Sequence, residues 1–156
     1  MKTFAAWTEA LANVGVLIGI IFLTIEVSQN TLATKSDASL AIQTAISESI
    51  SRVQSNPALF DVVYKIYYEE ELTPKEYLLA AFYWHSFLTL MDGAVLQYEL
   101  GVIDLEVLQI YDQELYVTTH QTTFAKRYWE NEADSFSPAL QAYVANVIKN
   151  FREGAR

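Results

Sequence analysis

A charge-free apolar run close to the N-terminus stands out from the rest of the chain. Residues 10–25 read ALANVGVLIGIIFLTI, and Glu9 and Glu26 bracket them. A helix of about 16 residues is about 24 Å long, whereas a bilayer core of about 30 Å usually takes about 17–25 residues. Apolar neighbours on both sides extend the run, and Trp7 suits a membrane–water boundary. We therefore predict a transmembrane helix, with a buried helix of a soluble bundle as the alternative.

The same segment has some features of a secretory signal peptide. Lys2 supplies a weak basic start, and Thr31-Leu32-Ala33 loosely resembles a cleavage site. However, Glu9 interrupts the approach to the apolar run, and the run is long for the apolar part of a signal peptide. An uncleaved signal anchor is therefore the better interpretation.

Beyond the anchor, the chain becomes polar but keeps a helical pattern. Ile42, Ile46, Ile50 and Val53 recur at helical spacing. No Gly or Pro interrupts the chain between the anchor and Asn56-Pro57. We therefore expect the anchor to continue into one long helix that ends there, because the residue before proline disfavours helix.

The remaining chain predicts a series of shorter helices. The segment Thr73-Pro74-Lys75-Glu76 has the pattern of a capping box, which predicts the start of a helix. We expect this helix to run to Leu100, with Gly101 as its C-terminal cap. The middle of that helix is apolar nearly all round, so we predict the central core helix rather than a second membrane span. Further helices are predicted over 57–69, 104–118 with Asp104 as its cap, 123–131 and 138–151.

These elements together define the expected architecture. We predict an all-α protein in which residues 1–30 form the transmembrane anchor and residues 31–156 form a helical domain. The N-terminal transmembrane helix continues into a long helix and is followed by a small antiparallel helical bundle. Few breakers and no long alternating runs support this fold class.

The order of several short phrases resembles a widespread family of small uncharacterised bacterial proteins. Members open with one apolar helix that ends in a Q-I-R-Q-N-T-like motif, followed by an Ala-rich helix. The matching phrases here are IEVSQNT at 25–31, Asn56-Pro57, LTPKE at 72–76, Asp92, Gln97-Tyr98, GVID at 101–104, Tyr128-Trp129 and Phe136-Ser137-Pro138. The resemblance covers nearly the whole chain and implies architecture, but no function. Ser28 departs from it, because the family tends to have Arg there.

Composition excludes several classes of function. The net charge of −9 argues against nucleic acid as a partner and against binding to anionic headgroups through charge. The chain has no Cys, which excludes disulfides and thiolate chemistry. With only two His and no nucleophile–base, metal or phosphate-binding motif, we expect no enzymatic activity, no metal and no cofactor.

A polar stripe on the predicted central helix is the first candidate site. His85, Asp92 and Glu99 recur every seven residues and so share one face. We expect an internal hydrogen-bond network in which Asp92 bonds to Tyr or His, and a hydrogen-bonded core position for His85. The alternative is a pocket or proton path. A pocket would be formed by Trp84, His85, Asp92 and Tyr98.

Two other polar positions have simpler interpretations. His120 is expected to be a surface residue at a helix end. The run Glu69-Glu70-Glu71 is expected to be a solvated helix end.

The anchor carries the second candidate site, a face of small residues. Gly15 and Gly19 would let two helix backbones approach closely. With Ala12 and Phe22 they form the predicted oligomer interface, and Glu26 and Gln29 would add a polar ring at the membrane boundary. A chance pair of small residues is the alternative.

The functional expectation is a membrane-anchored, non-enzymatic helical scaffold or complex subunit that self-associates. The alternatives are a small-molecule sensor or binding bundle, and an oligomeric ion-conducting pore. The expected partners are the lipid bilayer and further copies of the chain. The expected location is the bacterial inner membrane, crossed once, with the large domain in the cytoplasm, although Lys2, Lys35 and Arg52 give little orientation bias.

Overall fold

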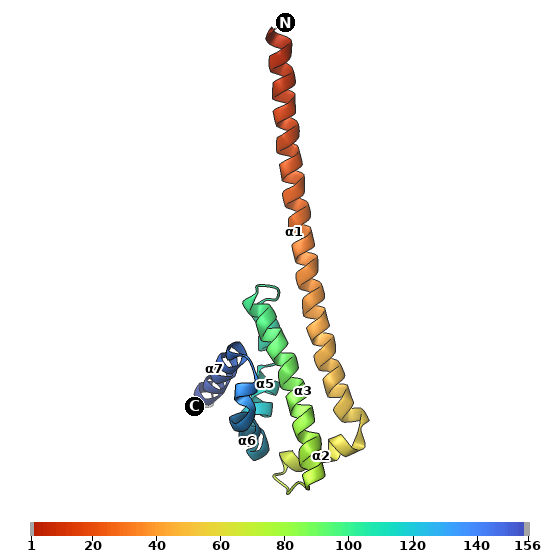
Figure 1. The fold of residues 1–156 in the computed structure, drawn as a ribbon, viewed down its shortest axis with the longest axis vertical. Coiled ribbons are helices and arrows are strands. Elements are labelled where there is room, and N and C mark those ends of the chain that lie inside the picture. The colour runs from red at the N-terminus through yellow and green to blue at the C-terminus, as the bar shows by residue number, and fades with distance from the viewer. Residues whose placement is uncertain (1, 155–156) are drawn as a thin grey trace. The chain divides into compact units, whose positions relative to one another are not determined.

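The structure, a computed structural model, describes the backbone of residues 2–154 and the side chains of residues 15–154. Over that range the chain is all-α and contains no strand, which confirms the predicted fold class (Figure 1). The helices are α1 (Lys2–Ser55), α2 (Pro57–Tyr67), α3 (Pro74–Glu99), α4 (Leu105–Gln109), α5 (Asp112–Tyr116), α6 (Thr123–Glu132) and α7 (Pro138–Gly154). A π-helical turn, η1 (Val117–Gln121), and a 3-10 turn, η2 (Ala133–Ser135), complete the set.

The chain divides into two compact units, Met1–Asp37 and Ala38–Arg156. This division falls later than the boundary at residue 30 expected from hydropathy. The second unit contains the end of α1, where Ile42, Ile46 and Ser49 are buried. The predicted continuation of the anchor into a long helix is confirmed, because α1 ends only at Ser55.

Two local devices end α1 and start α2 directly afterwards. The Asn56 side chain accepts a hydrogen bond from the Leu59 amide at 3.3 Å, and Pro57 is the first residue of α2. Proline suits this position because its missing N–H would have no partner there in any case.

Helix α3 is the centre of the second unit, as its apolar pattern predicts. Its capping box is present, because Thr73 accepts from the Glu76 amide and Glu76 accepts from the Thr73 amide. Gly101 follows the helix with φ +70°. Its amide bonds to the Tyr98 carbonyl at 2.8 Å and the Val102 amide bonds to the Gln97 carbonyl at 2.9 Å, which together form a Schellman motif. The buried face of α3 contacts α2, α4 and α7 and consists of Ala80, Trp84, Phe87, Leu88, Met91, Ala94 and Val95.

The predicted helix over 104–118 is wrong. The chain forms two short helices, α4 and α5, followed by the π-helical turn η1. Thr118 and Thr119 hydrogen-bond back to the carbonyls of Glu114 and Leu115 at 2.8 and 2.6 Å. Such bonds compete with the regular helical pattern, and β-branched residues also favour helix less. Asp104 precedes α4, but its side chain makes no capping hydrogen bond.

The C-terminal part of the chain follows the predicted pattern more closely. Thr122 caps α6 by accepting from the Ala125 amide at 3.2 Å, and Ser137 accepts from the Leu140 amide at 3.2 Å at the start of α7. Leu140, Val144 and Val147 of α7 are buried in the same core as α3. The cap of α7 positions that helix beside the first of the cavities described below.

Candidate functional site

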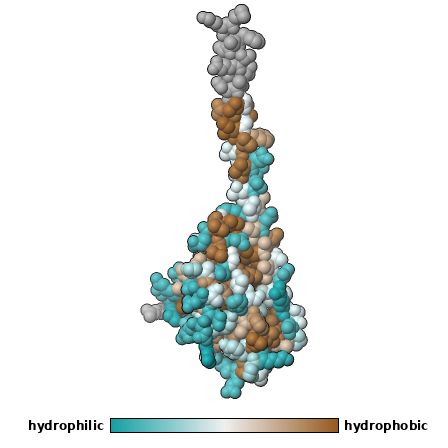
Figure 2. Space-filling view, viewed as in Figure 1, coloured by the Kyte–Doolittle hydropathy of each residue, from teal (hydrophilic) through white to brown (hydrophobic). Residues whose placement is uncertain are grey.

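The first feature with functional potential is the apolar segment 16–27 of α1. Its nine Val, Leu, Ile and Phe side chains are all between 50% and 72% exposed. Figure 2 shows apolar side chains on the surface of this segment. By length and composition, the helix is long and apolar enough to cross a membrane, and none of its apolar window is buried.

Two hydroxyl groups, one in this segment and one just after it, are satisfied inside the helix. The Thr24 hydroxyl donates to the Ile20 carbonyl at 2.8 Å, and the Thr31 hydroxyl donates to the Val27 carbonyl at 2.8 Å. Helical backbone bonds satisfy the main chain in the same way. Hydrocarbon offers no hydrogen-bond partners, so hydroxyl and backbone groups that are satisfied within the helix favour a membrane span.

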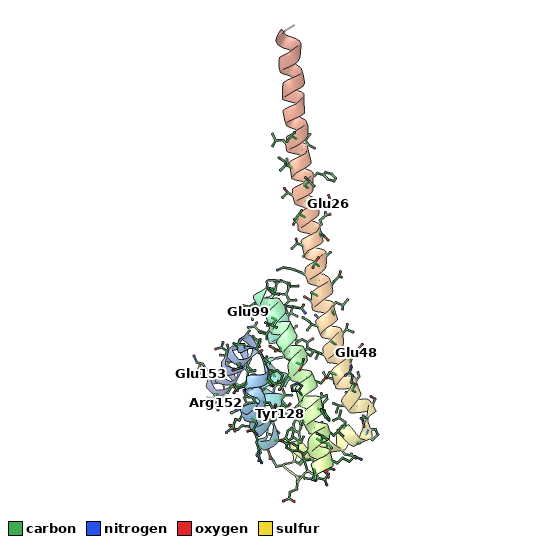
Figure 3. The ribbon with its side chains drawn as sticks, viewed as in Figure 1. Glu26, Glu48, Glu99, Tyr128, Arg152 and Glu153 are labelled. Atoms are coloured by element: carbon green, nitrogen blue, oxygen red, sulfur yellow. The ribbon has the colours of Figure 1, made fainter. Side chains whose placement is uncertain are left out.

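The predicted oligomer face is open in the described structure. Gly15, Gly19, Phe22, Glu26 and Gln29 lie within about 80° around the helix axis, at about 100° per residue. A Cβ atom at either glycine would meet nothing within 4 Å. All five residues are exposed, and Figure 3 labels Glu26 on this segment. The side chain of Ala12 lies outside the described residues.

The four residues of the predicted pocket do not meet in one cavity. Trp84 is 4% exposed and lines a cavity beside α2 and α5, whereas Tyr98 lines a different cavity beside α7. His85 and Asp92 line neither. Helical spacing brings residues to one face of a helix, but several helices pack around α3 and divide its surface between separate cavities.

The expected buried position of His85 is wrong, because His85 is exposed. Its ring lies 5.2 Å from the Phe136 ring, at the edge of the contact between α3 and the start of α7. The neighbouring Phe82 is also exposed, at 67%, whereas Trp84 and Phe87 are buried, so apolar neighbours in the sequence did not reveal which face of α3 carries His85.

Asp92 forms a hydrogen-bond network, but with a different partner from the one expected. Its carboxylate accepts from the Ser137 amide at 3.1 Å and from the Ser137 hydroxyl. Neither Tyr nor His is the partner. Asp92 therefore connects the middle of α3 to the first turn of α7.

A polar cavity of about 410 Å³ lies between α3, α4, α5 and α7. Tyr143 donates to Asp112 at 2.7 Å in its wall. Burial raises the pKa of Asp112, and the hydrogen bond from Tyr143 opposes that rise. Burial and the bond to Asp112 both raise the pKa of Tyr143. Glu99, labelled in Figure 3, also lines this cavity, so its wall carries two carboxylates.

A second cavity of about 440 Å³, here called the aromatic cavity, lies between α1, α2, α3, α5 and η1, within the second unit. Its aromatic lining consists of Phe60, Tyr67, Tyr83, Trp84 and Phe87. The Trp84 indole donates to the Thr118 carbonyl at 3.0 Å, which fixes η1 against α3. Tyr83 hydrogen-bonds to Ser49, and burial raises its pKa against the opposing effect of that bond.

Glu114 is the unusual polar residue of the aromatic cavity. Its Oε2 atom is buried and has no hydrogen-bond partner. A buried carboxylate oxygen without a donor destabilises the fold by a few kcal/mol. Among the described residues that line the aromatic cavity, Glu114 is the only one with a formal charge.

His120 lies in η1 and is only partly exposed, whereas the sequence predicted a surface residue at a helix end. Arg152, labelled in Figure 3, donates from Nη2 to His120 Nε2 at 2.8 Å. Burial lowers the pKa of His120 most, and the charges of Arg152 and Lys126 lower it further. The contact holds the end of α7 against η1.

Glu69, from the acidic run, has a structural role that the sequence analysis missed. Its side chain accepts from the Thr123 amide at 2.9 Å, at the start of α6. Its backbone has φ +55°, which is rare for a residue with a side chain. Glu70 and Glu71 are exposed, in agreement with a solvated helix end.

No metal site is found, because no group of three His, Asp or Glu side chains in the described part of the chain is arranged to hold an ion. Comparisons with protein-family models, with curated proteins and with solved structures find no match to this chain.

Proposed function

We propose that the chain is a single-pass membrane protein whose N-terminal helix anchors a non-enzymatic helical domain. The observation that supports this is the exposure of nine large apolar side chains over residues 16–27. Since each is 50–72% exposed, moving them from water into hydrocarbon is worth on the order of 10 kcal/mol. A core helix of a soluble bundle would instead cover most of these side chains with its own chain.

Flotation of membranes from cells that express the full-length chain tests the anchor. The wild-type chain is expected to float with lipid and to need detergent for extraction. Ile18→Asp with Ile21→Asp places two carboxylates in the span, each unfavourable by about 2.5–3.5 kcal/mol at its centre. That variant should no longer float. Leu100→Asp, at a side chain that is 78% exposed in the second unit, is the matched control and should float as the wild type does. Recovery of the wild-type chain dissolved without detergent would refute the anchor.

Self-association along the glycine face is the second part of the proposal. The open surface at Gly15 and Gly19 supports it, because small residues let packed helices approach closely in lipid. Cross-linking in membranes should show an oligomer that Gly15→Leu with Gly19→Leu disrupts. Leu17→Phe with Ile20→Phe enlarges the opposite face and should leave the oligomer intact. An unchanged oligomer in the glycine variant would exclude this interface.

The proposed location is the bacterial inner membrane, with the second unit in the cytoplasm. The absence of native cysteine makes orientation simple to measure, because one introduced thiol is the only target. Ser36→Cys places it at an exposed position. A membrane-impermeant maleimide should label it only in lysed cells. Labelling in intact spheroplasts would show that the second unit lies outside the cytoplasm and would contradict the proposed orientation.

A further inference from the structure

The aromatic cavity has the size and lining of a ligand site. Its volume of about 440 Å³ falls within the roughly 300–1,000 Å³ common for small-molecule pockets. Phe60 and Tyr67 contribute from α2, and Tyr83, Trp84 and Phe87 contribute from α3. An aromatic wall of this kind suits an apolar group and also attracts a cation through the negative ring faces.

One buried acceptor in the lining of the cavity has no hydrogen-bond partner. The Thr118 hydroxyl donates to the Glu114 carbonyl at 2.8 Å, and Tyr83 bonds to Ser49. The Trp84 N–H donates to the Thr118 carbonyl. The Glu114 Oε2 atom remains without a donor although it is buried.

The missing group is therefore a hydrogen-bond donor, and charge decides which kind. An anion would be repelled by the Glu114 carboxylate, and no Lys or Arg is among the described residues of the lining. A hydrocarbon would fill the volume but leave Oε2 unsatisfied. An organic ammonium ion supplies N–H donors and positive charge to Glu114 while its apolar body lies against the aromatic rings.

We propose that the aromatic cavity binds an organic ammonium ion with an apolar body, with Glu114 as its counter-ion. In the complex, the Glu114 side chain turns so that Oε2, which is enclosed in this structure, reaches the cavity and accepts from the ammonium group. The apolar body packs against the rings of Tyr83, Trp84 and Phe87. This assignment concerns the second unit and does not depend on the anchor.

Calorimetric titration of the full-length chain in detergent tests the proposal with 2-phenylethylamine, which is protonated at pH 7. Its neutral counterpart, 2-phenylethanol, has the same body without the charge. The amine is expected to bind at least about tenfold more tightly than the alcohol, because a charged hydrogen bond is lost in the latter. Equal binding of the two, or no binding of the amine beyond its partition into empty micelles, would overturn the proposal.

Glu114→Gln removes the charge with little change of shape and should weaken amine binding by about tenfold or more. Glu106→Gln removes an exposed carboxylate outside the cavity and should leave binding unchanged. If Glu114→Gln binds the amine as the wild type does, Glu114 is not the counter-ion and the proposal is wrong.

A second pair of variants covers the case in which Glu114→Gln fails to fold. Ile50 lines the cavity and is 41% exposed, so Ile50→Trp narrows the cavity from its rim without disturbing the core. Leu40→Trp, at a side chain that is 62% exposed on the same helix and outside the cavity lining, is the matched control. Amine binding should be lost in the first variant and kept in the second. Binding kept in both would place the ligand elsewhere and refute the assignment.

Discussion

The connection between Asp92 and Ser137 makes the sharpest stability prediction. The Asp92 carboxylate accepts two hydrogen bonds from Ser137, one from the amide and one from the hydroxyl. Hydrogen bonds to charged groups stabilise a fold by about 1.5–3 kcal/mol. Asp92→Asn keeps the shape and one acceptor oxygen, so it loses about one of the two bonds. Because the site is only partly buried, we expect a loss at the low end, about 1.5 kcal/mol.

That loss converts into a measurable change in melting temperature. The second unit spans residues 38–156, about 120 residues, and unfolding entropy near 60 °C is about 2.1 cal/mol/K per residue. A loss of about 1.5 kcal/mol therefore lowers the melting temperature by about 6 °C. Near-ultraviolet circular dichroism of the full-length chain in detergent reports tertiary packing and is insensitive to the anchor's helicity. Asp134→Asn, at an exposed carboxylate near the same turn, is the control and should shift by less than about 2 °C.

A double-mutant cycle separates this interaction from other effects. Ser137→Ala removes the hydroxyl that donates to Asp92 and that accepts from the Leu140 amide. The two single changes should be less than additive when combined, with a coupling of about 1 kcal/mol. Strict additivity, or an Asp92→Asn variant as stable as the wild type, would refute the reasoning.

Three further changes test other parts of the second unit. The hydrogen bond from Lys65 lowers the pKa of Glu76 to about 2. In urea unfolding, the wild type should therefore be more stable than Glu76→Gln above about pH 4.5. This difference should disappear as the pH falls toward about 2. Glu69→Gly and Glu69→Ala both lose the hydrogen bond to α6, but only glycine relieves the positive φ. The free energy of unfolding should therefore be about 1 kcal/mol higher for Glu69→Gly than for Glu69→Ala, with a higher melting temperature. Leu88→Ala leaves a cavity at a fully buried position and should lower the free energy of unfolding in urea by about 2–5 kcal/mol. The exposed Leu78→Ala is the control and should lower it by less than about 1 kcal/mol.

Local sequence patterns predicted the parts of the fold that depend on local physics. The capping box at Thr73 and Glu76, the proline at the start of α2 and the glycine after α3 are all present, because each involves residues within one turn of the chain. The middle of α3 is apolar nearly all round, and this predicted its central position. Local patterns of this kind specify where helices begin, end and present an apolar face.

The candidate sites depend on contacts that no local pattern carries. Trp84 and Thr118 are 34 residues apart, Asp92 and Ser137 are 45 apart, and Glu69 and Thr123 are 54 apart. Periodicity places a residue on a face of its own helix but says nothing about which helix covers that face. Spacing along α3 therefore groups His85 and Asp92 with Trp84 and Tyr98, although the packed helices separate them.

The break in the predicted fourth helix is the most consequential of these differences, because it builds the aromatic cavity. Threonines at 118, 119, 122 and 123 weaken the helix through β-branching and hydroxyl bonds to the backbone, so a π-helical turn competes there with regular helix. The wider turn leaves the Thr118 carbonyl available to the Trp84 indole. The Thr118 hydroxyl also donates to the Glu114 carbonyl, and Glu114 lines the cavity with Oε2 buried and without a donor. Proteins tend to break such local rules at functional sites, so an irregular helix and an unsatisfied carboxylate at the same place support the ligand site proposed for this cavity.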